Sequence, residues 1–314
     1  MTNNWAKTPT VDVTPPDLTP YRDSNIGIPY VTTLNAGSPG PHVLAIALTH
    51  GNEISGAIAL DRLLRAGIRP KQGKLTLAFA NVAAYERFDS SQPHRWRCVD
   101  EDFNRVWNAA TLGGPRNSVE LTRARELRPL IDTVDALLDL HSMTAPSPPL
   151  ALVGLHDKSL TLARQVGLPE IVVRDPGHAD GTRMRDYGAF GDPSAAAVAL
   201  LVECGQHWLR ATADFAYDVT TRFLATTGII DGPTAPRATA QRLLDVTHVI
   251  TATSDHFAFV EHFQGLAVLA KAGTVVAHDG GIAVRTPYDD CVITMPSTRV
   301  GPGQTAVRFG RFRK

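Results

Sequence analysis

Short apolar runs alternate with helix-like segments in the part of the 314-residue chain that precedes Pro233. Apolar residues recur at helical spacing over 54–64, and Gly67 is suited to end that helix. The runs around it are almost wholly apolar, with Thr76 and Asp139 as the polar exceptions, as in strands that are buried on both faces. The clearest four cover residues 43–48, 75–80, 136–140 and 198–202. Strands that alternate with helices predict an α/β fold, with a mixed, mostly parallel sheet between helices.

The pattern changes after Pro233, where short β-rich runs are separated by Gly and Pro turns. These runs cover residues 246–253, 266–269, 274–277, 282–285, 292–295 and 305–309. We therefore expect two domains, a larger α/β domain over 1–232 and a smaller C-terminal all-β domain over 233–314.

Residues that can bind metals lie at the ends of the buried runs. His50 and Glu53 come after the first of the four runs, His141 after the third and Glu203 after the fourth. Because the carboxyl ends of parallel strands meet at one edge of a sheet, we expect these side chains to lie close together.

An imidazole and a carboxylate three positions apart, as in His50 and Glu53, can bind one small cation. Zinc is the usual occupant of mixed nitrogen and oxygen sites, and His141 is the natural third ligand. Three protein ligands leave one position for water, as in catalytic zinc sites. Asp139 lies on the same side of its strand as His141. It is either a group that orients this ligand or an ordinary carboxylate at a strand end.

Glu203 follows five apolar residues, so we expect a buried functional carboxylate rather than a simple partner of an arginine. Its expected role is general base on water and then general acid to a leaving amine. The long loop at 81–108 contains Arg97 and Arg105. One guanidinium near a carbonyl can stabilise an oxyanion, and a second can hold a carboxylate. Asp100, Asp102 and Asn104 have the spacing of the first ligands of a calcium-binding loop. The sequence does not fit such a loop, because Arg105 and Thr111 occupy the positions that require Gly and Glu.

Composition narrows the classes of protein. The formal net charge of zero gives no electrostatic reason to expect nucleic acid or an acidic membrane as a partner. No stretch reaches the roughly 18 apolar residues that a membrane helix needs. The three cysteines form no Cys-x-x-Cys pair, and residues 1–22 have no apolar core of a signal peptide, so we expect a cytoplasmic protein. Other histidines, including His178 and His207, are expected at the surface or in structural roles.

Four motifs in order resemble the succinylglutamate desuccinylase/aspartoacylase family, a branch of the carboxypeptidase A-like zinc hydrolases. They are His50-Gly51-Asn52-Glu53, Arg97-x-x-Asp100-x-Asp102-x-Asn104-Arg105, Asp139-Leu140-His141-Ser142 and Val202-Glu203-Cys204-Gly205-Gln206. The resemblance covers about residues 48–206, and the β-rich C-terminal part is similar to that family's second domain.

The resemblance implies one zinc ion on His50, Glu53 and His141, with Glu203 as general base. It also implies that Arg97 polarises the scissile carbonyl and that Asn104 with Arg105 binds the carboxylate of the substrate. Aspartoacylases have a further substrate-binding arginine about ten residues before the general base, where this chain has Pro193. Either Arg183 or Arg185 could replace it.

We therefore expect a zinc-dependent amidohydrolase, or deacylase, that cleaves the amide bond of a small N-acyl amino acid or related N-acyl amine. The first alternative is a zinc carboxypeptidase that acts on peptides, and the second is a catalytically silent binding protein on the same scaffold. The sequence leaves open the acyl group, assembly into a homo-oligomer, and the roles of the loop at 175–193 and of Tyr288.

Overall fold

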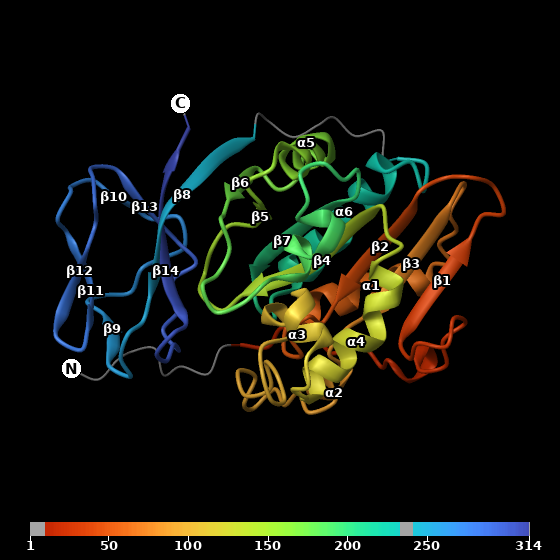
Figure 1. Ribbon diagram of the computed structural model, residues 1–314, viewed down its shortest axis with the longest axis horizontal. Coiled ribbons are helices and arrows are strands. Elements are labelled where there is room, and N and C mark those ends of the chain that lie inside the picture. Colours follow the sequence, from red (N-terminus) through yellow and green to blue (C-terminus); the bar gives the residue numbers. More distant parts are fainter. Residues whose placement is uncertain (1–9, 233–240, 314) are drawn as a thin grey trace.

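One sheet of 11 strands runs through the whole computed structural model, which describes residues 10–232 and 241–313 (Figure 1). The strands in spatial order are β1 (Val31–Asn35), β3 (Lys74–Phe79), β2 (His42–Ala47), β4 (Ala136–Met143), β7 (Val198–Gln206), β5 (Leu150–Val153), β6 (Ile171–Arg174), β8 (Arg242–Thr251), β14 (Thr305–Phe312), β13 (Cys291–Thr294) and β10 (Val268–Leu269). The N-terminal half is mostly parallel, because only the pairs β1–β3 and β5–β7 are antiparallel among the strands from β1 to β8 in this order. The predicted fold class is confirmed.

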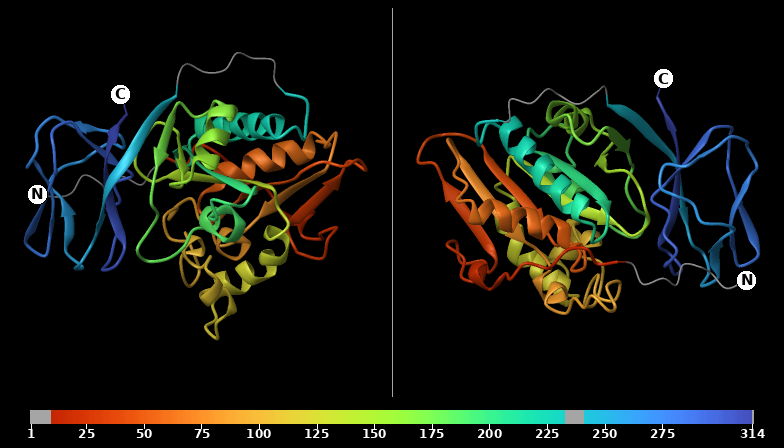
Figure 2. Two further views of the ribbon diagram at one scale, coloured as in Figure 1. Left: turned by 45° about the horizontal axis from the view of Figure 1, so that its top comes forward. Right: turned by 180° about the vertical axis from the view of Figure 1, so that it is seen from behind.

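Helices cover both faces of the N-terminal half of the sheet (Figure 2). The apolar sides of α1 (Ile54–Arg65), α5 (Asp157–Val166) and α6 (Arg210–Thr226) pack on one face. The opposite face is covered by α4 (Val119–Ile131), which starts at the capping residue Ser118, and by loop residues such as Trp107. The short helix α2 (Val82–Tyr85) lies in the segment that the sequence predicts as a long loop, and α3 (Ala109–Gly113) begins directly after that segment. Central strand β4 is buried along its whole length, as its apolar sequence predicts.

The C-terminal part is an antiparallel β region at the β6 end of the sheet (Figure 1). Its second, three-stranded sheet contains β12 (Ile282–Arg285), β11 (Val275–Asp279) and β9 (Phe257–Phe259), of which β9 has no counterpart in the predicted runs. Strand β8 links the two halves, because it pairs in parallel with β6 and antiparallel with β14. The predicted domain boundary falls at the start of 233–240, which is outside the described residues, and stays a prediction.

Two central strands are longer than predicted. β4 continues through His141 to Met143, and β7 continues through Glu203 to Gln206. His141 and Glu203 are register partners on these two parallel strands, so both lie inside the sheet rather than after it. Within the described residues, no helix is long and apolar enough to span a membrane.

Candidate active site

The turn after β2 places His50 and Glu53. Buried Leu48 has a left-handed backbone (φ 61°), a costly conformation for a bulky residue that surrounding structure must hold. Its carbonyl accepts a hydrogen bond from the Asn81 backbone N–H at 2.8 Å. Gly51 is required by space, since a Cβ there would lie 2.5 Å from the backbone carbon of Ala84. The chain therefore reverses sharply against α2 and presents both side chains at the edge of the sheet.

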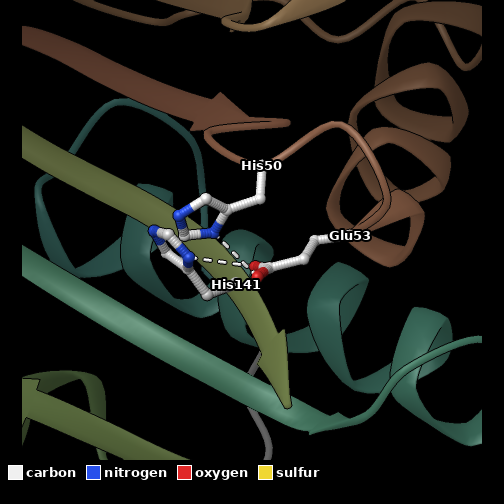
Figure 3. Close-up of side chains that lie close together, drawn as sticks. All are labelled: His50, Glu53 and His141. Carbon is white, nitrogen blue, oxygen red and sulfur yellow. Dashed lines mark hydrogen bonds and ion pairs between the residues drawn. The ribbon is translucent and has the colours of Figure 1, made fainter. Parts of the chain in front are cut away.

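His50, Glu53 and His141 form a buried cluster (Figure 3). His50 Nδ1 lies 2.7 Å from Glu53 Oε1, and His141 Nδ1 lies 2.9 Å from Glu53 Oε2. All three offer ligand atoms within 4.8 Å of one another, and each residue is only 3% exposed. The structure thus brings together the three residues predicted as metal ligands, and this group could hold one metal ion.

The far nitrogen of each ring faces an aspartate. His50 Nε2 lies 2.9 Å from Asp102 Oδ1, and His141 Nε2 lies 2.9 Å from Asp139 Oδ2. Asp139 is itself fixed by the Thr49 hydroxyl, which donates to Oδ1 at 2.7 Å. When each Nε2–H donates to its aspartate, the Nδ1 lone pairs face the centre of the cluster, as in carboxylate–histidine–metal sites. From the sequence, Asp139 has two alternative roles, whereas Asp102 appears only within the Arg97–Arg105 motif and without a role of its own.

The electrostatics of the cluster favour a cation. Burial lowers the pKa of His141, but the Asp139 and Glu53 carboxylates outweigh burial and raise it well above its ordinary value. Burial raises the pKa of Glu53, yet the two imidazoles hold it well below its ordinary value. A proton on His141 therefore balances the carboxylates when no metal is bound, and a divalent cation could replace it.

Glu203 lies beside this cluster on β7, next to His141 in the sheet. Its Oε2 is buried and has no hydrogen-bond partner among the described residues. Burial, with a smaller contribution from Glu53, raises the pKa of Glu203 to about 8. Orphaned buried oxygens are rare in folded proteins, and perturbed carboxyls in clefts are candidates for proton transfer.

Arg97 faces the same cluster from the loop that precedes α3. Its Nη1 donates to Glu53 Oε1 at 2.8 Å, and its Nη2 lies 2.7 Å from His50 Nε2. The Arg97 side chain is 41% exposed, so part of the guanidinium faces the cleft. The structure therefore puts this predicted residue next to the candidate metal ligands.

Asn104 and Arg105 line the cleft in different ways. The Asn104 amide is buried, accepts a hydrogen bond from the Met184 N–H at 2.8 Å and lies 3.4 Å from His141 Nε2. Arg105 Nε donates to Asp180 Oδ1 at 3.1 Å, and its side chain is 17% exposed. Both predicted substrate-binding residues thus reach the cavity that contains the three candidate ligands.

This cavity of about 310 Å³ lies between the sheet edge and the C-terminal β region. Its walls include Arg183 and Arg308, of which Arg308 comes from β14. Both arginines contact buried Asp175, at 2.7 and 3.2 Å. Of the two arginines proposed as replacements for the one missing at Pro193, Arg183 lines the cavity and Arg185 does not.

Two histidines expected at the surface or in structural roles also line the cavity. His178 Nε2 lies 2.7 Å from Arg183 Nη2, and His207 Nδ1 lies 2.8 Å from the Ser142 hydroxyl. Burial lowers the pKa of His207 to about 3, so this ring is neutral. Tyr288 is not among the lining residues; it stacks on Arg311. Nothing in the spacing of the sequence distinguishes His178, His207 or Arg308, because each reaches the cleft through long-range packing.

The site combines a place for one cation, an unpaired carboxyl and a guanidinium in a small cleft. This arrangement of groups is suited to metal-assisted hydrolysis. A model of the succinylglutamate desuccinylase/aspartoacylase catalytic domain matches residues 39–225. The chain belongs to this family, whose members are deacylases.

Individual relatives agree with this assignment. A probable aspartoacylase of Parasynechococcus marenigrum (strain WH8102) is 34% identical over 137 residues, which are 40% of this chain and 44% of that protein. The match therefore spans less than half of the length of this curated relative. Succinylglutamate desuccinylase of Vibrio parahaemolyticus has the same fold, with a TM-score of 0.68 at 18% identity over 91% of this chain and 87% of its own. An ectoine utilization protein of Ruegeria pomeroyi gives 0.63 at 18% identity, over 90% and 88%.

We expect Asp139→Asn to weaken binding of a divalent metal ion, with Zn²⁺ as the probe, about 10- to 100-fold, because the amide no longer raises the basicity of His141. Competition against a chromophoric chelator measures this affinity, and a thermal melt of the metal-free protein shows whether the fold persists. Unchanged affinity in a folded variant would mean that Asp139 does not support the metal site.

Proposed function

We propose that the protein is a zinc-dependent amidohydrolase that cleaves the amide bond of a small N-acyl amino acid or a related N-acyl amine. The observation that carries this proposal is the His50–Glu53–His141 cluster, with an aspartate behind each imidazole and the unpaired Glu203 carboxyl beside it. The donor set of two nitrogens and one carboxylate suits zinc and leaves a position for water. When bound, zinc would supply Lewis-acid polarisation of the amide carbonyl and would lower the pKa of a water molecule.

The protein's own groups then move protons and hold charge. Glu203 in its ionised form takes a proton from the attacking water and gives it to the departing amine nitrogen, so that one carboxyl serves both steps. Arg97 donates hydrogen bonds toward the carbonyl oxygen as negative charge develops there. A catalytically silent binding protein on this scaffold would be expected to lack Glu203, Arg97 or one of the candidate metal ligands. This chain has all of these residues, which argues against that alternative.

The walls of the cleft suggest the shape and charge of the substrate. A cavity of about 310 Å³ is at the small end of ligand sites, which favours a small N-acyl compound over a peptide. Asn104 and Arg105 are proposed to hold the carboxylate of the amino-acid part. Arg183 and Arg308 share one buried carboxylate, Asp175, so this wall carries surplus positive charge that a second acidic group on the substrate would balance.

The three cysteines are free thiols, which is consistent with the proposed cytoplasmic location.

A substrate panel tests the proposed reaction. We expect release of free amino acid from at least one of a set of N-acetyl, N-succinyl and N-formyl amino acids, with the highest kcat/KM for compounds that carry two acidic groups. Arg308→Gln should reduce that preference while leaving turnover of compounds with one acidic group. Hydrolysis of C-terminal residues from peptides, with none of the N-acyl compounds cleaved, would favour the carboxypeptidase alternative.

The two loop arginines should affect different kinetic constants. We expect Arg105→Ala to raise KM, because a carboxylate clamp binds the ground state and the transition state alike. Arg97→Ala should lower kcat, on the order of 10²–10³-fold, because an oxyanion contact strengthens as charge develops. Zinc content is measured in parallel, since Arg97 also contacts Glu53. The same pure KM change in both variants would contradict these roles.

Glu203→Gln should retain zinc and substrate binding but lower turnover by about 10²–10⁴-fold. The Glu203 pKa of about 8 refers to the metal-free site, and an adjacent cation lowers it because opposite charge favours the carboxylate. In the wild type, kcat/KM should therefore fall as pH falls through a value below 8, since the base becomes protonated. This acidic limb should vanish or move in the variant. Loss of zinc would instead make Glu203 a ligand, and near-normal turnover would make it structural.

A further inference from the structure

A fully buried carboxylate lies behind the loop that carries Arg97. Glu120, in the first turn of α4, is 0% exposed and accepts four hydrogen bonds. Its Oε1 accepts from the Val99 N–H at 2.6 Å and from the Asn81 amide at 2.9 Å. Its Oε2 accepts from the N–H groups of Asp100 and Glu101, at 3.0 and 3.2 Å. One side chain thus binds three successive backbone N–H groups of the loop.

The contacts are reciprocal, since the loop also caps the helix. Asp100 Oδ2 accepts from the Val119 N–H at 2.7 Å, and the Ser118 hydroxyl donates to Glu101 Oε1 at 2.5 Å. Negative charge at this end of α4 is favoured by the helix dipole. Burial of a carboxylate is costly unless hydrogen bonds satisfy it, and here backbone N–H groups and an amide do so. The segment 99–101 is therefore fixed to the start of α4.

This fixed segment lies between the two parts of the loop that reach the candidate metal ligands. On one side, Arg97 donates to Glu53 at 2.8 Å, and its carbonyl accepts from the Gly51 N–H at 2.9 Å. On the other side, Asp102 immediately follows Glu101 and faces His50 Nε2 at 2.9 Å. The Arg97 side chain is 41% exposed and is held by its hydrogen bond to Glu53 rather than by tight packing, so this contact requires the loop backbone to be in place.

We propose that Glu120 is a positioning residue for the active site: it holds residues 99–101 and thereby sets the placement of Arg97 and Asp102. This inference rests on the proposed function for its kinetic consequence, but not for its structural one. Glu120 touches none of the groups that would contact substrate, and it acts through the loop backbone. The arrangement makes the N-terminal end of α4 part of the support of the catalytic groups.

Glu120→Gln is the direct test, because it keeps the size of the side chain while an amide NH₂ replaces one acceptor that faces backbone N–H groups. We expect faster hydrogen exchange at the amides of 99–101, and a fall in kcat on the order of 10²-fold, since small misplacements of catalytic groups cost about that much. In an Arg97→Ala background, Glu120→Gln should lower kcat less than it does in the wild type, because the part of its effect that acts through Arg97 is already lost and only the part that acts through Asp102 remains.

Asp279→Asn is the matched control. Asp279 in β11 is 7% exposed and also accepts four hydrogen bonds, from the backbone N–H and hydroxyl groups of Thr253 and Ser254. It lies outside the cleft, so this variant should lower the melting temperature without changing kcat or exchange at 99–101.

Unchanged exchange at 99–101 in Glu120→Gln, or a fully additive effect with Arg97→Ala, would overturn the proposal. If hydrogen exchange at 99–101 is faster in Glu120→Gln but the wild type has no deacylase activity, the result would support the positioning role of Glu120 and count only against the proposed reaction. If Glu120→Gln does not fold, Glu120→Asp decides by the same measurements, because it keeps the charge but withdraws both oxygens from the loop.

Discussion

A buried carboxylate between two imidazoles is the interaction on which the site depends. Glu53 faces Nδ1 of His50 and of His141, while Asp102 and Asp139 face the outer nitrogens of the same rings. Three carboxylates around two imidazoles carry more negative charge than neutral rings can balance. Arg97 supplies one positive charge to Glu53 and Asp102, and the remaining negative charge favours a further cation, either a proton on an imidazole or a metal ion; the ring orientation suits the metal.

The rest of the fold can be understood as support for this cluster. The parallel order of β2, β4 and β7 brings the three chain segments to one edge of the sheet, and the strained Leu48 and close-packed Gly51 turn the chain there. The loop held by Glu120 supplies the aspartate behind His50 and the guanidinium beside Glu53. The C-terminal β region lines the cleft and contributes Arg308, so both halves of the chain form the walls of the proposed substrate site.

The sequence predicts the buried strands and the proximity of His50, Glu53 and His141 well, because both leave local signals. Mostly apolar runs identify β2, β3, β4 and β7, and the geometry of parallel strands predicts that the ligand-type residues at the ends of β2, β4 and β7 lie close together. The strand bounds are less accurate, since β4 and β7 continue past His141 and Glu203. The supports of the cluster could not be predicted in the same way. Asp102, Glu120 and Arg308 act through partners distant in sequence, and no periodicity records such contacts.

Metal content tests the central claim most directly. The purified protein should contain about one zinc ion per chain by elemental analysis, because two imidazoles and a carboxylate form one site. Dialysis against a strong chelator should remove the metal and abolish amide hydrolysis, and addition of one equivalent of Zn²⁺ should restore it. Protein that contains no metal, and whose amide hydrolysis is unaffected by the chelator, would contradict the account.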